Sequence, residues 1–111
     1  MTGSETERKL RLYAIERGCR FYKLDGPNDV GKPDRVVLCN GVTVYVEFKG
    51  PTEALSVKQK REHQRIRDAD GVVCVVDNLE DGKNLIDWLL LQHPGTAASL
   101  QLPNTARGTH G

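Results

Sequence analysis

The chain has 111 residues, enough for one compact domain built around a single core. Its content of 38% hydrophobic and 28% charged residues is typical of a globular protein and excludes a disordered chain. The formal net charge of +1 excludes a polycation, and no apolar run approaches the ~20 residues that a bilayer-spanning helix needs, so we expect no membrane partner.

The first pattern along the chain is helical. "SETERKLRLYAIERG" carries apolar residues at helical spacing, with Ser4 as a candidate N-cap and Gly18 as a stop, and predicts a helix over residues 5–17. "CRFYKL" predicts a short strand over residues 19–24. The following "DGPNDVGKP" is rich in Gly, Pro and Asp and predicts a loop.

Two runs rich in β-branched residues come next. "DRVVLC" (34–39) and "VTVYVEFK" (42–49) are separated by Asn40 and Gly41, a strong signal for a β-hairpin with a two-residue turn. Alternation along the second strand predicts one face that supplies core, namely Val42, Val44, Val46 and Phe48.

The hairpin register brings charged residues together. With Asn40 and Gly41 in the turn, Asp34 faces Glu47 with Cβ atoms ~5 Å apart, and Lys49 projects from the same face as Glu47. Facing carboxylates repel, so a shared proton, Lys49 or a metal ion is expected between them. The alternatives are a surface salt bridge of Lys49 without any chemistry, or a one-residue slip that separates the two acids.

The second half of the chain predicts a helix, a strand and a helix. "SVKQKREHQRIRDAD" has Ser56 as its N-cap and Gly71 after its end, and "VVCVVD" predicts a strand covered on both faces. In "LEDGKNLIDWLLLQH", Gly82 weakens the first turn. The residues of this helix that we expect to pack inward are Leu85, Ile86, Trp88 and Leu89, with Leu90 as a further candidate.

The order αβββαβα predicts an α/β domain with a mixed sheet over residues 1–93. Residues 94–111 are small, polar and interrupted by Gly and Pro, so we expect a mobile tail. The three cysteines, Cys19, Cys39 and Cys74, have no CxxC spacing and lie in or beside apolar stretches, which predicts buried free thiols. Together with an N-terminus that lacks an apolar segment, this favours a cytoplasmic location.

Several segments together resemble a known family. Pro33-Asp34 and Glu47-Phe48-Lys49 look like the PD-(D/E)XK nuclease motif. With "GKPDRVVL", "VYVEFKGP", "LSVKQKREHQRIRDADG" and "VVCVVD", the chain resembles the small stand-alone VRR-NUC domains of phages and bacteria over about residues 5–92. The resemblance implies a restriction-endonuclease-like αβββαβ core and a metal-dependent DNA endonuclease inside a bacterial cell, encoded by the bacterium or by a phage.

The resemblance also implies roles for the clustered residues. Asp34 and Glu47 would bind Mg²⁺ or Mn²⁺ with help from the backbone carbonyl of Phe48. Lys49 would position and activate the attacking water or stabilise charge on the phosphate. A metal held by these oxygens can polarise water and act as a Lewis acid, which is the chemistry that phosphodiester hydrolysis needs.

Two residues outside the hairpin match the family pattern. Glu7 would support the metal shell, in preference to Glu5, and Gln59 would brace the site from one turn inside the second helix. The sequence departs from the family at Lys32, where an apolar residue is frequent, and at Phe48, which replaces a frequent leucine. Neither departure affects a residue expected to bind the metal through its side chain.

Basic residues gather in the second predicted helix. Lys58, Arg61 and Arg65 lie at helical spacing along one side, and Lys60 lies on an adjacent side. They predict contacts with the DNA backbone, and the alternative is an exposed solubilising face. Lys23 and Arg35 flank the acidic pair and are further DNA-contact candidates.

The remaining expectations concern partners and alternatives. A domain of this size offers little area to grip a duplex, so we expect a homodimer, and the resemblance favours branched or Holliday-junction-like DNA. The alternatives are a catalytically silent DNA-binding module on the same fold, or a restriction or end-processing nuclease. His63 has no second ligand at zinc spacing, so we expect it in helix packing or in solvent.

Overall fold

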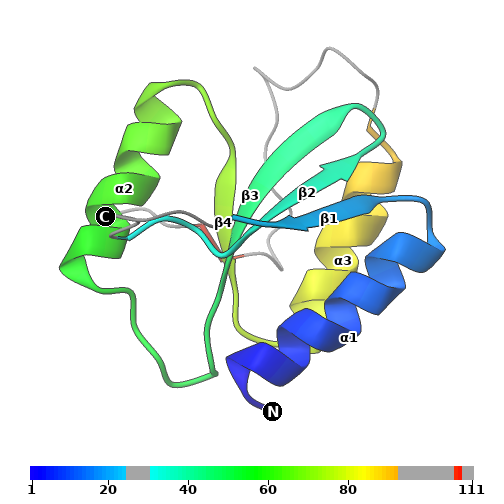
Figure 1. The fold of residues 1–111 in the computed structure, drawn as a ribbon, viewed down its shortest axis with the longest axis horizontal. Coiled ribbons are helices and arrows are strands. Elements are labelled where there is room, and N and C mark those ends of the chain that lie inside the picture. The colour runs from blue at the N-terminus through cyan, green and yellow to red at the C-terminus, as the bar shows by residue number, and fades with distance from the viewer. Residues whose placement is uncertain (25–30, 93–106, 109–111) are drawn as a thin grey trace.

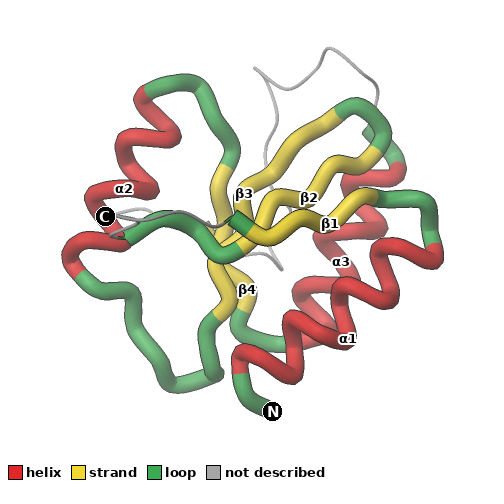
Figure 2. Tube along the Cα trace, viewed as in Figure 1, coloured by secondary structure: helices red, strands yellow, loops and turns green. Residues whose placement is uncertain are grey.

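The computed structural model describes residues 1–24, 31–92 and 107–108, and it has three helices around a mixed sheet (Figure 1). The elements are α1 (Gly3–Glu16), β1 (Arg20–Lys23), β2 (Arg35–Cys39), β3 (Val42–Phe48), α2 (Val57–Asp68), β4 (Val73–Val76), α3 (Leu79–Leu90) and β5 (Arg107–Gly108). In Figure 2, α1 and α3 lie together on one side of the sheet and α2 lies on the other. The α/β class and the predicted order αβββαβα are thus confirmed from α1 to α3, and β5 is an additional strand after α3.

The sheet has the strand order β1-β2-β3-β4-β5. The first three strands are antiparallel, β4 lies parallel to β3 after the connection through α2, and β5 pairs antiparallel with β4. The mobile tail expected over 94–111 falls mostly outside the described residues, but Arg107–Gly108 within it form a strand. None of the helices in the described part of the chain is long and apolar enough to cross a membrane.

The hairpin between β2 and β3 has the predicted register. Cys39 pairs with Val42 and Arg35 with Val46, and the turn residues Asn40 and Gly41 have φ of 53° and 81°. Such left-handed angles at both central positions define a type I′ turn, whose twist matches that of the flanking strands. The register therefore excludes the one-residue slip that would separate the two acids.

One face of the sheet forms the core with α1 and α3. Fully buried side chains on this face come from β2 and β3, and they meet Leu10 and Ala14 of α1 and Leu85, Ile86 and Leu89 of α3. A Cβ at Gly82 would lie 2.8 Å from Leu10 Cδ2, so this glycine allows α1 and α3 to pack closely.

Two details of the helices differ from the sequence predictions. The N-cap of α1 is Thr2, whose hydroxyl accepts a hydrogen bond from the Glu5 N–H at 3.1 Å, and not Ser4. Leu90, a candidate for inward packing, is 37% exposed because it lies on the outer side of the last turn of α3. Trp88 is partly buried against the core, as expected.

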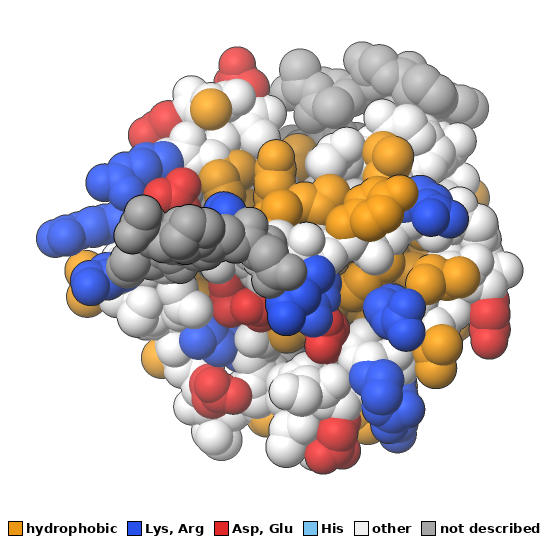
Figure 3. All heavy atoms as spheres, viewed as in Figure 1, with side chains coloured by type: hydrophobic (Ala, Val, Ile, Leu, Met, Phe, Trp, Pro, Cys, Tyr) orange, Lys and Arg blue, Asp and Glu red, His pale blue; other side chains and the backbone are white. Residues whose placement is uncertain are grey.

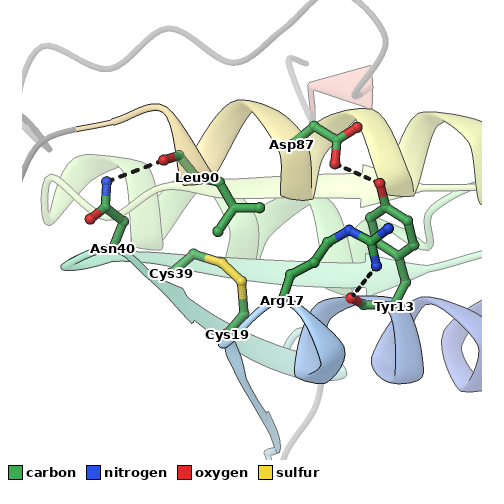
Figure 4. Close-up of a disulfide and its surroundings, with 7 residues drawn as sticks. All are labelled: Tyr13, Arg17, Cys19, Cys39, Asn40, Asp87 and Leu90. Carbon is green, nitrogen blue, oxygen red and sulfur yellow. Dashed lines mark hydrogen bonds between the residues drawn. A yellow bond between two sulfur atoms is a disulfide. The ribbon is translucent and has the colours of Figure 1, made fainter.

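Cys19 and Cys39 form a disulfide, so the prediction of free thiols is wrong for both (Figure 4). Their Cα atoms are 4.7 Å apart. Because Arg20 pairs with Leu38 in the antiparallel β1–β2 ladder, the next opposed positions are Cys19 and Cys39. Cys74 is buried and free, as predicted.

Candidate active site

The acidic pair lies at the end of the β2–β3 hairpin that is remote from the turn. Asp34 directly precedes β2, and Glu47 is the next residue of β3 after the Arg35–Val46 pair. Asp34 Oδ2 accepts a hydrogen bond from the backbone N–H of Phe48 at 2.9 Å. The hairpin thus brings the carboxyl groups of Asp34 and Glu47 close enough to interact electrostatically.

Glu47 is unusually buried for an acidic residue, because only 2% of it is exposed. Burial raises the pKa of its carboxyl above the ordinary value, and the neighbouring Asp34 carboxyl raises it further. The neighbouring His63 side chain and the positive charge of Lys49 act in the opposite direction on this pKa. The corner therefore holds negative charge in a desolvated place, where a cation between the carboxylates would be strongly stabilising.

Lys49 follows β3 and is half-buried beside this corner. Its backbone N–H donates to the carbonyl of Val76 at 3.0 Å, which ties the residue to the end of β4. The structure thus brings Asp34, Glu47 and Lys49 together, as the hairpin register predicts.

Gln59 holds Glu47 from α2. Ser56 caps this helix, and the Gln59 side chain completes a capping box by accepting the Ser56 N–H at Oε1, 2.9 Å away. The same side chain donates from Nε2 to Glu47 Oε2 at 3.3 Å. Gln59 therefore has the contact that a bracing role requires.

His63 is a part of the site that the sequence analysis missed. It is fully buried, and its Nε2 lies 3.7 Å from Glu47 Oε1. The expectation of helix packing accounts for its burial but not for this contact. A signal was present in the sequence, because His63 follows Gln59 by four residues and so shares its face of the helix.

Glu7 and Arg35 form an ion pair beside the acidic pair. Arg35 also donates from Nη1 to the carbonyl of Asp34 at 2.9 Å. Both side chains line an open pocket of about 440 Å³ at the N-terminus of α1. Its other lining residues are Thr2, Gly3, Ser4, Lys23, Asp34, Phe48 and Glu53. Glu7 is thus placed near Asp34, while Arg35 already has an anionic partner.

The basic residues of α2 lie elsewhere. Lys58, Arg61 and Arg65 are exposed, and helical geometry places them on the side of α2 opposite the inward-facing Gln59 and His63. Figure 3 shows Lys and Arg side chains gathered along the edge of the molecule that α2 forms. Arg65 Nη1 lies 3.3 Å from Glu62 Oε1 in an exposed pair.

The remaining two DNA-contact candidates are also exposed. Lys60 lies on α2, and Lys23, at the end of β1, lines the pocket beside Asp34. Most of the α2 cations are therefore separated from the acidic pair by the width of the helix, whereas Lys23 is close to it.

The donor set at the corner fits a hard cation. Glu47 Oε1 is buried and has no hydrogen-bond partner among the described residues. Nowhere in residues 1–24, 31–92 and 107–108 do three His, Cys, Asp or Glu side chains group as metal ligands. Two carboxylates with backbone oxygen and water suit Mg²⁺ or Mn²⁺, whereas a structural zinc site takes four protein ligands.

Comparisons with known proteins agree with this architecture. No family model matches the sequence. "Putative nuclease p44" of Acyrthosiphon pisum secondary endosymbiont phage 1 is 41% identical over 58 residues, which are 51% of this chain and 62% of that protein. The chain thus spans less than two thirds of the length of this curated relative.

A solved structure described as a VRR_NUC domain gives a TM-score of 0.60 at 33% sequence identity. The similarity covers 74% of this chain and 95% of the solved one. Nearly the whole length of that domain is therefore matched in both fold and sequence, and the restriction-endonuclease-like fold implied by the motifs is confirmed. On this evidence, the chain belongs to the VRR-NUC family.

Proposed function

We propose that this chain is a metal-dependent DNA nuclease that hydrolyses phosphodiester bonds. The observation that carries the proposal is the buried carboxylate of Glu47 facing Asp34, with Lys49 beside it. A buried acid beside a second acid is costly unless the pair serves a cation or shares a proton. Membership of the VRR-NUC family and the similarity to a phage protein named as a nuclease support the same activity.

Asp34, Glu47 and the backbone carbonyl of Phe48 would hold the metal, Mg²⁺ or Mn²⁺. When bound, this ion supplies a polarised water and a Lewis acid for the phosphate. Lys49 adds positive charge at the phosphoryl oxygens, where partial burial strengthens its effect. Gln59 keeps Glu47 oriented, and Glu7 would reach the metal shell only by sharing its carboxylate with Arg35.

DNA would be held by phosphate contacts. Lys23 lies close enough to the pocket to reach a phosphate near the cleaved bond. Lys58, Lys60, Arg61 and Arg65 would hold a more distant part of the backbone, because they occupy the exposed surface of α2. Arg35 would contribute mainly by fixing Glu7 and the Asp34 backbone.

The finer parts of the proposal are a homodimer and selectivity for branched, Holliday-junction-like DNA. Leu90 and Leu91 are 37% and 76% exposed at the end of α3, and they supply apolar surface for a contact between two copies. Two sites related by a two-fold axis would suit paired incisions in a four-way junction. The proposed place of action is the interior of a bacterial cell.

The test is cleavage of linear duplex, single-stranded, flapped and four-way DNA in the presence of Mg²⁺, Mn²⁺ or EDTA. We expect symmetric nicks in the four-way substrate, and none with EDTA. Glu47→Gln, which removes the charge and keeps the shape, is the matched control and should abolish cleavage. Metal-independent cutting, or cutting by this variant, would refute the metal assignment. DNA binding without any cleavage would instead indicate a silent DNA-binding module.

A further inference from the structure

We propose that His63 is a positioning residue that fixes the carboxylate of Glu47 by donating its Nε2–H to Oε1. The inference rests on the proposed function, because it gives His63 a role in holding a metal ligand. Gln59 donates to Oε2 of the same carboxylate. Gln59 and His63 lie one helical turn apart on the same face of α2. This face would then hold both oxygens of the Glu47 carboxylate.

The two groups lie just beyond hydrogen-bonding distance. Nε2 and Oε1 are 3.7 Å apart, so the proposed bond requires a side-chain adjustment that brings them to the ~2.9 Å of an N–H···O bond. Both groups are almost wholly buried, with side chains 0% and 3% exposed. Neither atom has another hydrogen-bond partner in the described part of the chain. Buried polar atoms left unpaired are costly, so each group is the natural partner of the other.

A purely space-filling role for His63 explains less. A leucine at this position would fill similar volume on the inner face of α2, but it would leave Glu47 Oε1 buried without a donor. The carboxylate could then rotate away from Asp34, or take up a proton instead of a cation. The imidazole prevents this rotation because it fixes one oxygen while Gln59 fixes the other.

The two donors do not block a cation. Each carboxylate oxygen has two lone pairs, and one hydrogen bond at each oxygen leaves the other lone pair available. Donors that orient a metal ligand in this way typically change metal affinity or activity about 10–100-fold when they are removed. For His63 we expect the loss in kcat and in metal affinity, with little change in KM for DNA, because α2 turns its DNA-facing cations to the opposite side.

The first test compares variants of the full chain. His63→Leu removes the donor, His63→Gln keeps an N–H at similar reach, and Gln64→Leu is a control at the exposed neighbouring position. Mn²⁺ affinity is measured by calorimetry without DNA, and kcat and KM by cleavage. We expect His63→Leu to weaken Mn²⁺ binding and kcat about 10-fold or more, and His63→Gln to recover most of the loss. The control should match the wild type.

The second test needs no variant and no metal. In ¹⁵N-histidine-labelled wild-type protein, we expect an Nε2-bound proton on His63 that exchanges slowly and shows a hydrogen-bonded chemical shift. An unprotonated Nε2 would overturn the inference even if His63→Leu failed to fold. Wild-type Mn²⁺ affinity and kcat in His63→Leu would overturn it while leaving the proposed function intact. A wild-type protein that neither binds Mn²⁺ nor cuts DNA would overturn both.

Discussion

Asp34 Oδ2 accepts the backbone N–H of Phe48, the residue that follows Glu47, at 2.9 Å. This bond joins the segment before β2 to the end of β3 at the point where the hairpin ladder stops. Asp34 is therefore both a candidate metal ligand and a structural acceptor, and these two roles can be separated by substitution.

Asp34→Asn keeps an oxygen acceptor for Phe48 and removes the charge. We expect it to cut DNA at least about 100-fold more slowly, since a charged metal ligand is removed, while its free energy of unfolding stays near that of the wild type. Asp34→Ala should reduce activity equally and also cost about 1–3 kcal/mol, because the Phe48 N–H is left without its partner. Urea unfolding and Mg²⁺-dependent cleavage measure the two effects. Equal free energies of unfolding for Asp34→Asn and Asp34→Ala would contradict the structural role of Asp34 as acceptor for the Phe48 N–H.

The raised pKa of Glu47 predicts a pH dependence of stability. In the folded chain this carboxyl takes up a proton more readily than in the unfolded chain, whose ordinary pKa is 4.5. The resulting contribution to stability is fully present below pH 4.5 and is lost as pH rises through the higher folded pKa. As pH rises through this range, the free energy of unfolding of Glu47→Gln should therefore increase relative to that of the wild type. Denaturant unfolding in EDTA measures this difference. If the difference in free energy of unfolding between the two proteins did not change with pH, burial could not be the cause of a raised Glu47 pKa.

The Cys19–Cys39 disulfide predicts sensitivity to reductant. The bond closes a loop with a sequence separation of 20, and removing it should cost about 3 kcal/mol through added freedom of the unfolded chain. Thermal unfolding with and without dithiothreitol measures this loss. A Cys19→Ala/Cys39→Ala variant is the control, because its melting temperature should not respond to reductant. An unchanged melting temperature of the wild type would show that the bond does not form.

The exposed cations of α2 predict weaker DNA binding when they are removed. Lys58→Ala/Arg61→Ala/Arg65→Ala should lower DNA affinity and reduce the slope of log K against log salt by about 1 for each phosphate that the variant no longer neutralises. The rate at saturating DNA should stay unchanged, because these side chains point away from Glu47. Fluorescence anisotropy at several salt concentrations gives the slope. The control variant Lys9→Ala/Lys83→Ala removes charge from α1 and α3 and should leave the salt slope unaltered.

The sequence was sufficient for those parts of the site that depend on local structure. The Asn40-Gly41 turn and the alternation along β3 determine the hairpin register, so the proximity of Asp34 and Glu47 followed directly. Ser56 as N-cap of α2 was likewise a local signal.

The sequence was insufficient where two distant segments meet. The Cys19–Cys39 bond requires the register of β1 against β2, and the connection between these strands, residues 24–34, is too long for turn chemistry alone to determine that register. The burial of His63 depends on how α2 is rotated about its axis against the sheet. Periodicity shows that Gln59 and His63 share a face, but only the packed structure shows that this face covers Glu47.

Residue 59 is a glutamine, whose neutral amide makes hydrogen bonds in two directions. The Gln59 amide must point its oxygen to the Ser56 N–H and its nitrogen to Glu47, so its flip state is determined. A glutamate would cap the helix as well but would bring a third negative group against the acids. Unwinding the opening turn of α2 would remove the donor to Glu47 Oε2 at the same time. Ordering of that turn and orientation of this carboxylate oxygen are thus coupled through one neutral side chain.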